Sequence, residues 1–298
     1  IFTGGFNAVI RTDKLQFGFM FLGFALLLIY SIKMFGGYTQ LAMALPKSHL
    51  SITGGASFQY ILVWFFIAIW TFVDPGFYQR CAAAKSPKTA QKGIIISIIF
   101  WFLFDILTLS TGLYAKAMLT GVDPLFAYPK LGALVLPPLA YGIFITGLLA
   151  TIMSTIDSLG MISAITFGRD ILWQINNNSS NNDSWDTQST SLIHKGLGVT
   201  SFIALALAFS IPSVVKLWYN LGSIIVPGLV IPFLMSFNKN RMQDGIIFMM
   251  VCPALASIIW IISGELLGNY PFNIEPFYPG IATSCLIYGW KVKNGKRN

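Results

Sequence analysis

Long runs of apolar residues, separated by short polar connections, dominate the chain. An α-helix needs about 20 mainly apolar residues to cross a bilayer, and eight runs are close to this length or longer. The runs are continuous rather than alternating, so membrane-spanning β-strands are not predicted. The fold class predicted is therefore an all-α integral membrane protein. The spanning helices are expected at about 15–36, 56–79, 93–118, 136–165, 196–212, 214–236, 245–267 and 273–290.

The composition agrees with this membrane assignment. Apolar residues make up 55% of the chain and charged residues only 10%, whereas soluble domains carry about 25% charged residues. The net charge of +8 does not indicate nucleic-acid binding, because most basic residues lie in the connections between apolar runs or at the ends of those runs. We expect residues 1–298 to form one polytopic membrane domain.

The basic residues also predict an orientation. Assigning the loops alternately to the two sides places 14 of the 19 Lys and Arg residues on one side and 5 on the other. Cytoplasmic loops carry the excess of Lys and Arg, so the richer side, with both chain ends, is expected in the cytoplasm. The longest connection on that side, residues 176–195, begins with a low-complexity polar run and is predicted to be a flexible linker.

Nothing in the sequence indicates an enzyme or an organic cofactor. No G-x-S-x-G, HExxH, GxGxxG or P-loop string occurs, and His49 and His194 lie in predicted loops. The three cysteines are far apart and have no metal-binding spacing.

The segment "ATIMSTIDSLGMISAITFGRDI", residues 150–171, places polar side chains inside a predicted membrane helix. Thr151, Ser154 and Ser158 share one stripe of small and hydroxylated residues, and Asp157 lies beside it. Hydroxyls together with a loosened helix carbonyl at Thr151 offer the neutral hard oxygens that suit an alkali cation. Two other interpretations stay open, since such hydroxyls also bond back to the helix backbone and small residues permit close helix packing.

A second candidate site lies in "AIWTFVDPGFYQR", residues 68–80. Pro75 removes a backbone donor, so we expect the helix to be kinked or unwound here. Broken helices line substrate sites in transporters, which makes Trp70 and Asp74 candidates for a solute site or gate. The alternatives are a packed aromatic for Trp70, and a helix cap or an ion pair with Arg80 for Asp74.

Three motifs resemble the sodium:solute symporter family, which includes sodium–glucose and sodium–proline carriers. "GGFNAVIRTDKLQ" resembles that family's GG-x-x-AV-x-x-TD-x-x-Q signature. "YQRCAAAKSPKTAQKG" resembles its QR-x-x-AAK loop, and "ATIMSTIDS" its A-A-x-M-S-[ST] helix. The resemblance covers about residues 1–175, beyond which only hydropathy agrees.

The resemblance implies an inverted-repeat, leucine-transporter-like bundle that is N-terminally truncated here. Thr12, Asp13 and Gln16 would open its fifth core helix. Residues 1–55 would hold the last helix of the first repeat and an outer loop. Residues 56–236 would form the second repeat, and residues 237–298 the C-terminal accessory helices.

The resemblance also implies a sodium site. Its ligands on the eighth core helix would be the backbone carbonyl of Thr151 and the hydroxyls of Ser154 and Thr155. The family has Ala where this chain has Thr151, but a carbonyl ligand tolerates that change. Asp157 is expected to line an additional sodium site or an exit path.

The function expected is sodium-coupled symport of a small organic solute across the plasma membrane by alternating access, with Na⁺ as the coupling ion and a lipid bilayer as the environment. One alternative is a proton-coupled carrier that uses Asp157. Another is the membrane sensor module of a signalling protein. The solute and the oligomeric state are not predicted.

Overall fold

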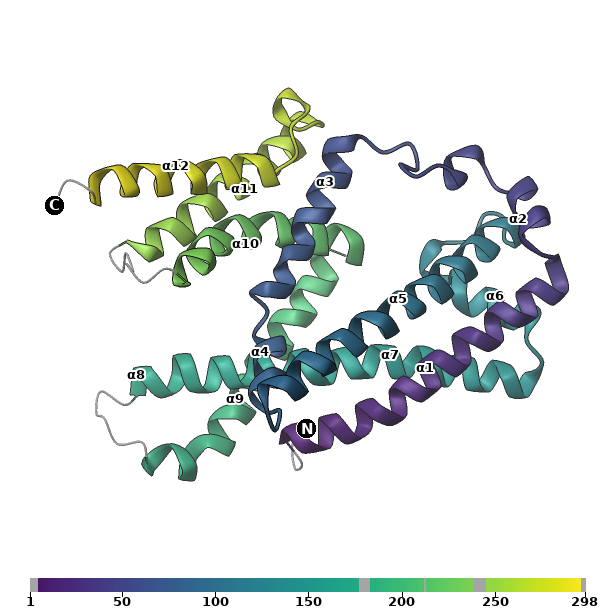
Figure 1. Ribbon diagram of the computed structural model, residues 1–298, viewed down its shortest axis with the longest axis horizontal. Coiled ribbons are helices and arrows are strands. Elements are labelled where there is room, and N and C mark those ends of the chain that lie inside the picture. Colours follow the sequence, from purple (N-terminus) through teal and green to yellow (C-terminus); the bar gives the residue numbers. More distant parts are fainter. Residues whose placement is uncertain (1–4, 177–182, 212, 238–244, 296–298) are drawn as a thin grey trace. The chain divides into compact units, whose positions relative to one another are not determined.

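The computed structural model describes residues 5–176, 183–211, 213–237 and 245–295, and all regular secondary structure within them is helical (Figure 1). The α-helices are α1 (Gly5–Phe35), α2 (Tyr38–Ala44), α3 (Phe58–Ile67), α4 (Pro75–Ala82), α5 (Pro87–Met118), α6 (Ala127–Val135), α7 (Pro138–Ile165), α8 (Gln174–Asn176), α9 (Asp183–Ser210), α10 (Val214–Ser236), α11 (Ile246–Leu267) and α12 (Phe277–Gly295). The 3₁₀ and π segments are η1 (Lys47–Leu50), η2 (Ala68–Phe72), η3 (Pro124–Phe126), η4 (Thr166–Trp173) and η5 (Pro271–Asn273).

Seven of the described helical stretches are long and apolar enough to cross a membrane. They correspond to the first seven predicted spans, so the all-α membrane class is confirmed. The eighth predicted span, 273–290, has no counterpart among the seven candidate spans. Most of that run forms α12, which starts only after Pro276. Its last turns carry Lys291 and Lys293, which lower its hydropathy. The side of the membrane on which the C-terminus lies therefore stays a prediction.

Two predicted boundaries in the fourth and fifth runs also differ. The fourth helix does not stop at residue 165 but continues as the π segment η4 to Trp173. Of the predicted linker 176–195, residues 177–182 lie outside the described residues, whereas the backbone is helical from Asp183 onward. A polar composition does not prevent a helix from extending beyond its apolar part, so residues 183–195 are helical where a flexible linker was expected.

The chain divides into two compact units that cut across the predicted repeat boundaries. Unit 1 consists of residues 1–54 and 78–205, and unit 2 of residues 55–77 and 206–298. Each is described below by itself.

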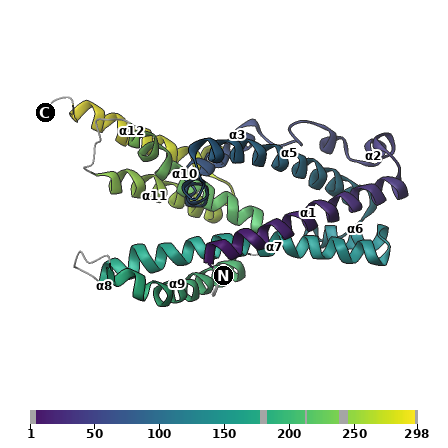
Figure 2. The same ribbon diagram turned by 60° about the horizontal axis from the view of Figure 1, so that its bottom comes forward.

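The main contact in unit 1 joins α1 to α7, which lie side by side (Figures 1 and 2). Two glycines allow this close approach. A Cβ at Gly147 of α7 would lie 2.4 Å from the carbonyl oxygen of Phe19. A Cβ at Gly23 of α1 would lie 3.0 Å from the Cα of Phe144. The two helix backbones are therefore nearly in contact, as small residues permit in membrane proteins.

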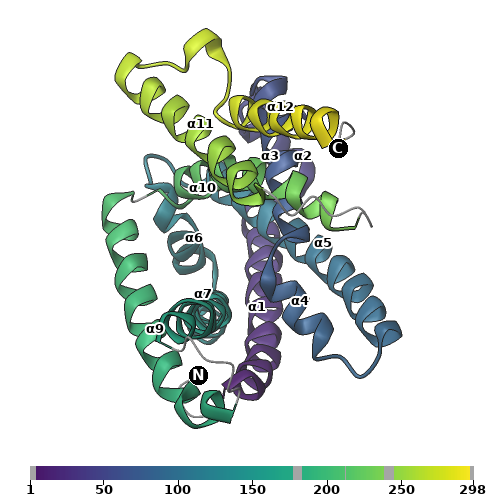
Figure 3. The ribbon, with the colours of Figure 1, turned by 90° about the vertical axis from the view of Figure 1, so that its left-hand side faces the viewer.

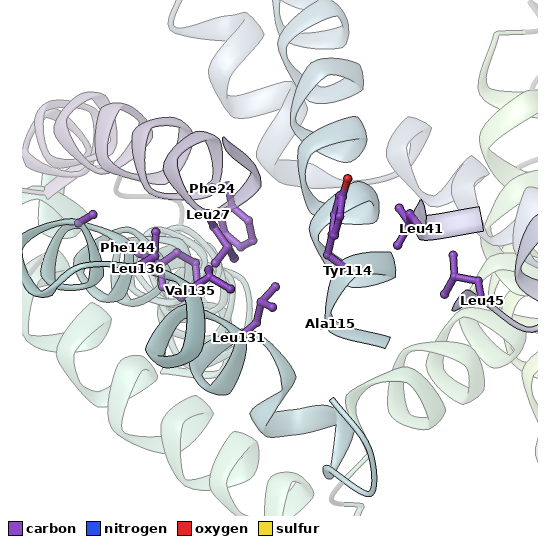
Figure 4. Close-up of a cluster of buried hydrophobic side chains, with 11 residues drawn as sticks. Phe24, Leu27, Leu41, Leu45, Tyr114, Ala115, Leu131, Val135, Leu136 and Phe144 are labelled. Carbon is purple, nitrogen blue, oxygen red and sulfur yellow. The ribbon is translucent and has the colours of Figure 1, made fainter. Parts of the chain in front are cut away.

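An apolar core extends from this contact to α5 and α6 (Figure 4). Leu27 and Phe144 are fully buried, and the Phe24 ring meets the Phe144 ring edge-on at 5.5 Å. Tyr114 of α5 donates a 2.8 Å hydrogen bond to the carbonyl oxygen of Gly36, where α1 ends. The core thus fixes the positions of α1 and α7, the two helices that carry the site described below.

In unit 2, α10, α11 and α12 pack against one another (Figure 3), and α3 packs on α10. Val63 and Ile67 of α3 are buried together with Tyr219 and Val226 of α10 and Phe277 of α12. A Cβ at Gly222 would lie 2.7 Å from the Ile67 side chain, so α3 lies against the α10 backbone. This packing holds the helix that leads to the predicted break.

The predicted break before Pro75 is confirmed. The α-helix α3 ends at Ile67 and becomes the 3₁₀ segment η2, which ends with a hydrogen bond from the Val73 amide to the Trp70 carbonyl. A new helix, α4, begins at Pro75. Proline suits the first helical position because its missing N–H needs no partner there.

Candidate cation and solute site

The three predicted cation ligands lie on α7, which is a regular α-helix at this point. The Thr155 hydroxyl donates to the Thr151 carbonyl at 3.0 Å, and the Thr151 hydroxyl donates to the Gly147 carbonyl at 3.0 Å. Ser154 is half-buried and Thr155 is exposed. The expected loosening of the helix is not found at these residues and occurs instead in η4. The hydroxyls of Thr151 and Thr155 thus both bond to carbonyls of their own helix, which is one of the interpretations that the sequence left open.

Ser154 behaves differently, because its hydroxyl bonds across to another helix. It donates a 2.8 Å hydrogen bond to Oδ1 of Asp13 on α1. The two residues are 141 positions apart in the sequence. A carboxylate therefore lies directly beside the predicted sodium ligands. The sequence placed Asp13 in a family motif but gave no sign of this pairing.

A guanidinium group completes the polar cluster. Arg80 Nη2 donates a 2.9 Å hydrogen bond to the Ser158 hydroxyl and lies 3.9 Å from Oδ2 of Asp13. The side chains of Arg80 and Asp13 are 44% and 26% exposed, so the ion pair is weakly stabilising at most. An ion pair with Arg80 was one of the two structural alternatives for Asp74, and the structure shows Arg80 in contact with Asp13.

Asp157 is half-buried on α7 and lies one residue before Ser158. Within the described parts of the chain it has no hydrogen bond or ion pair. The structure therefore leaves its carboxylate available for a cation, but brings no second ligand to it.

Gln16 is a further polar residue that was not predicted as part of the site. It lies one helical turn after Asp13 on α1 and is only 9% exposed. Its Oε1 is buried and has no hydrogen-bond donor among the described residues. A buried amide oxygen without a donor is costly, which makes it a candidate ligand.

The two predicted gate residues lie in unit 2, at the break between α3 and α4. The Trp70 ring packs 6.2 Å from the Trp218 ring of α10. Asp74 is half-buried and its Oδ1 accepts a 2.6 Å hydrogen bond from the Gly76 amide. This is the geometry of an N-cap on α4. Trp70 is therefore a packed aromatic and Asp74 a helix cap. These are the structural alternatives that the sequence left open beside a role at a solute site or gate.

Substitutions at Asp74 can separate these roles. Because Asn caps helices about as well as Asp, Asp74→Asn is expected to keep both the thermal stability and solute uptake. Asp74→Ala should lose about 1 kcal/mol of stability through the missing cap. A strong fall in uptake by the Asn variant, measured at unchanged protein level, would instead show that the charge of Asp74 acts on the solute.

The helical membrane architecture and the motifs on α1, α4 and α7 define a membrane transporter class, and comparison with known families agrees. The model of the sodium:solute symporter family matches residues 1–252. The chain therefore belongs to the sodium:solute symporter family. This membership points to a transporter rather than an enzyme, with Na⁺ as the coupling ion of the family.

Individual relatives agree with this assignment. The chain is 28% identical to the sodium/pantothenate symporter of Haemophilus influenzae, over 99% of this chain and 62% of that protein. It is 25% identical to the sodium/pantothenate symporter of Escherichia coli, over 96% of this chain and 60% of that protein. Identity to the high-affinity proline transporter PutP of Bacillus subtilis is 26%, over 95% of this chain and 60% of that protein. The chain thus spans about three fifths of the length of these relatives.

Proposed function

We propose that the chain is part of a sodium-coupled symporter that carries a small organic solute across the plasma membrane by alternating access. The observation that carries the proposal is the pairing of the Ser154 hydroxyl with the Asp13 carboxylate at 2.8 Å, in a member of the sodium:solute symporter family. The inverted-repeat arrangement and the division into repeats at residues 55 and 236 are part of this proposal.

The directions of the hydrogen bonds at α7 support a cation site. The hydroxyl hydrogens of Ser154 and Thr155 are both engaged, with Asp13 and with the Thr151 carbonyl respectively. The oxygen lone pairs are therefore left to face a cation, which is the orientation that a hydroxyl ligand needs. We propose Ser154 and Thr155 as sodium ligands, with Asp13 supplying the negative charge and Asp157 lining the path of the ion. The Thr151 carbonyl is the proposed third ligand, and to bind the ion it must give up the hydrogen bond that it accepts from Thr155.

The solute class is inferred from the relatives. Two of them are described as sodium/pantothenate symporters and one as a proline transporter, and pantothenate and proline are both small carboxylates. We therefore propose a small solute that bears a carboxylate. The break between η2 and α4 is the proposed solute gate, with Trp70 in η2 before the break and Asp74 within it as the cap of α4, because interrupted helices line the solute site in transporters of this kind.

The proposed coupling has a definite energy source. Each sodium ion that moves inward down a potential of 100 mV releases about 2.3 kcal/mol. A sodium ion bound to α7 would raise the affinity for the solute, and the solute would raise the affinity for sodium by the same factor.

Removing one hydroxyl at a time tests the sodium site. Thr155→Ala and Ser154→Ala, made in the full-length protein, are expected to raise the sodium concentration for half-maximal uptake about tenfold or more. A contact with a charged group contributes about 1.5–3 kcal/mol, and 1.4 kcal/mol corresponds to a factor of ten. The measurement is solute uptake as a function of sodium concentration, together with the thermal stability of each purified variant.

Thr146→Ala is the matched control for Thr155→Ala. Thr146 is also exposed on α7, and its hydroxyl also bonds back by four residues, to the Gly142 carbonyl at 2.9 Å. Its substitution should leave sodium activation unchanged. Normal sodium dependence in both site variants would reject the assignment, and uptake driven by a pH gradient without sodium would point to proton coupling.

A further inference from the structure

One end of unit 1 carries an excess of positive charge. The first half of α1, the helix α4, the turn between α4 and α5, and the beginning of α5 contribute six cations there, and Asp13 is an acidic residue among them. Apart from Arg80, these cations have no ion pair or hydrogen bond with any other described residue, and all of them are exposed. The six are Arg11, Lys14, Arg80, Lys85, Lys88 and Lys92.

Two recesses lie among these cations, and both are lined in part by the turn between α4 and α5. The first has a volume of about 510 Å³, and its wall includes Lys14, Arg80, the Asp13 carboxylate beside Arg80, and the apolar side chains of Ile10 and Phe17. The second has a volume of about 560 Å³, and its wall includes Lys85 and Ile94. Ala84 lines both recesses. Each recess therefore has a cationic side and an apolar side.

The surface beyond the second recess is apolar for several turns. Every residue of α5 from 91 to 103 is exposed, and the stretch from Ile94 to Leu103 has Ser97 as its one polar side chain. Within the described chain no residue of the 18-residue apolar window in α5 is buried. A ligand that fills the recess can thus continue along a hydrocarbon-like surface.

We propose that these adjoining recesses bind an anionic phospholipid, with its phosphodiester headgroup held by their cations, Lys14 in the first and Lys85 in the second, and its acyl chains along α5. Cationic pockets at the ends of membrane helices recognise anionic headgroups, and the exposed isoleucines supply the surface for the chains. A free phosphate would use the cations but gain nothing from the apolar walls, which is why the lipid is favoured.

The test uses native mass spectrometry of the full-length protein titrated with phosphatidylglycerol or with zwitterionic phosphatidylcholine. The wild-type protein is expected to retain phosphatidylglycerol in preference. The double variant Lys14→Gln/Lys85→Gln should bind it about twenty-fivefold more weakly, because each cation near an anionic lipid contributes a factor of about five. Binding of phosphatidylcholine should not change.

The matched control is Lys116→Gln/Lys130→Gln, which removes the same charge from exposed lysines at the other end of α5 and on α6. It should bind phosphatidylglycerol like the wild type. Equal losses in the two double variants, or none in the first, would overturn the proposal. Displacement of the lipid by inorganic phosphate would overturn it in favour of a small-anion site. Unchanged melting temperatures in phosphatidylcholine confirm that the variants are folded, and no outcome depends on transport.

Discussion

Replacing Asp13 with Asn is expected to raise the sodium concentration for half-maximal uptake about thirtyfold. Asn keeps an oxygen that can accept the hydrogen bond from Ser154, so the change removes the charge and little else. Two unit charges 4 Å apart interact by about 4 kcal/mol at an effective dielectric constant of 20. Asp13 is partly exposed and lies near Arg80, so we expect about half of this energy, about 2 kcal/mol.

The control for this charge effect is Asp105→Asn. Asp105 is an exposed acid on α5, and its substitution by Asn also removes one negative charge from the protein. It should leave sodium activation unchanged. Equal shifts in the two variants would mean that the overall potential of the protein, rather than a local ion site, sets the sodium dependence.

A double-substitution cycle shows whether Asp13 and Ser154 act on the same ion. Residues that contact each other give effects that do not add, whereas distant residues give additive effects. The variant Asp13→Asn/Ser154→Ala is therefore expected to show a smaller shift in sodium activation than the sum of the two single shifts. Simple additivity would separate Asp13 from the ligands on α7.

The parts of the fold that depend on local sequence were predictable. Continuous apolar runs predicted the first seven spans, since both the length and the hydropathy of a membrane helix are local properties. Pro75 predicted the break between η2 and α4, because proline acts on its own turn of the helix. The eighth run is not among the candidate spans of the described residues, because its apolar part is interrupted by Pro276 and followed by lysines.

The polar cluster shows why the rest could not be predicted. The family motif named Thr151, Ser154 and Thr155, but the contact of Ser154 with Asp13 joins residues 141 positions apart. No periodicity links two such positions, because the contact depends on how α1 packs against α7. The same is true of Arg80, whose contact with Asp13 joins two residues that are far apart in the sequence.

The packing of α1 on α7 gives the second large expected effect. Gly147→Ala is expected to destabilise the protein by about 3 kcal/mol, within the upper part of the range for overpacking. The added Cβ would lie 2.4 Å from the Phe19 carbonyl oxygen and 3.1 Å from its carbonyl carbon. These are backbone atoms of a helix, so the clash is relieved only if α1 and α7 move apart.

Gly142→Ala is the matched control on the same helix, since a Cβ at Gly142 meets nothing within 4 Å. Replacing Gly by Ala inside a helix normally gains about 1 kcal/mol, so the control should be neutral or slightly stabilising. The comparison of the two variants therefore isolates the steric clash from helix propensity. Unfolding in mixed micelles, followed by circular dichroism, measures the difference in stability.

The same substitution links packing to the ion site. Gly147 lies two helical turns before Ser154 on α7, so a separation of the helices at Gly147 should also weaken the Ser154–Asp13 contact. Gly147→Ala protein that still folds is thus expected to need more sodium for half-maximal uptake. If the variant loses stability but keeps wild-type sodium activation, the distance between α1 and α7 does not control the site, and Asp13 is not part of it.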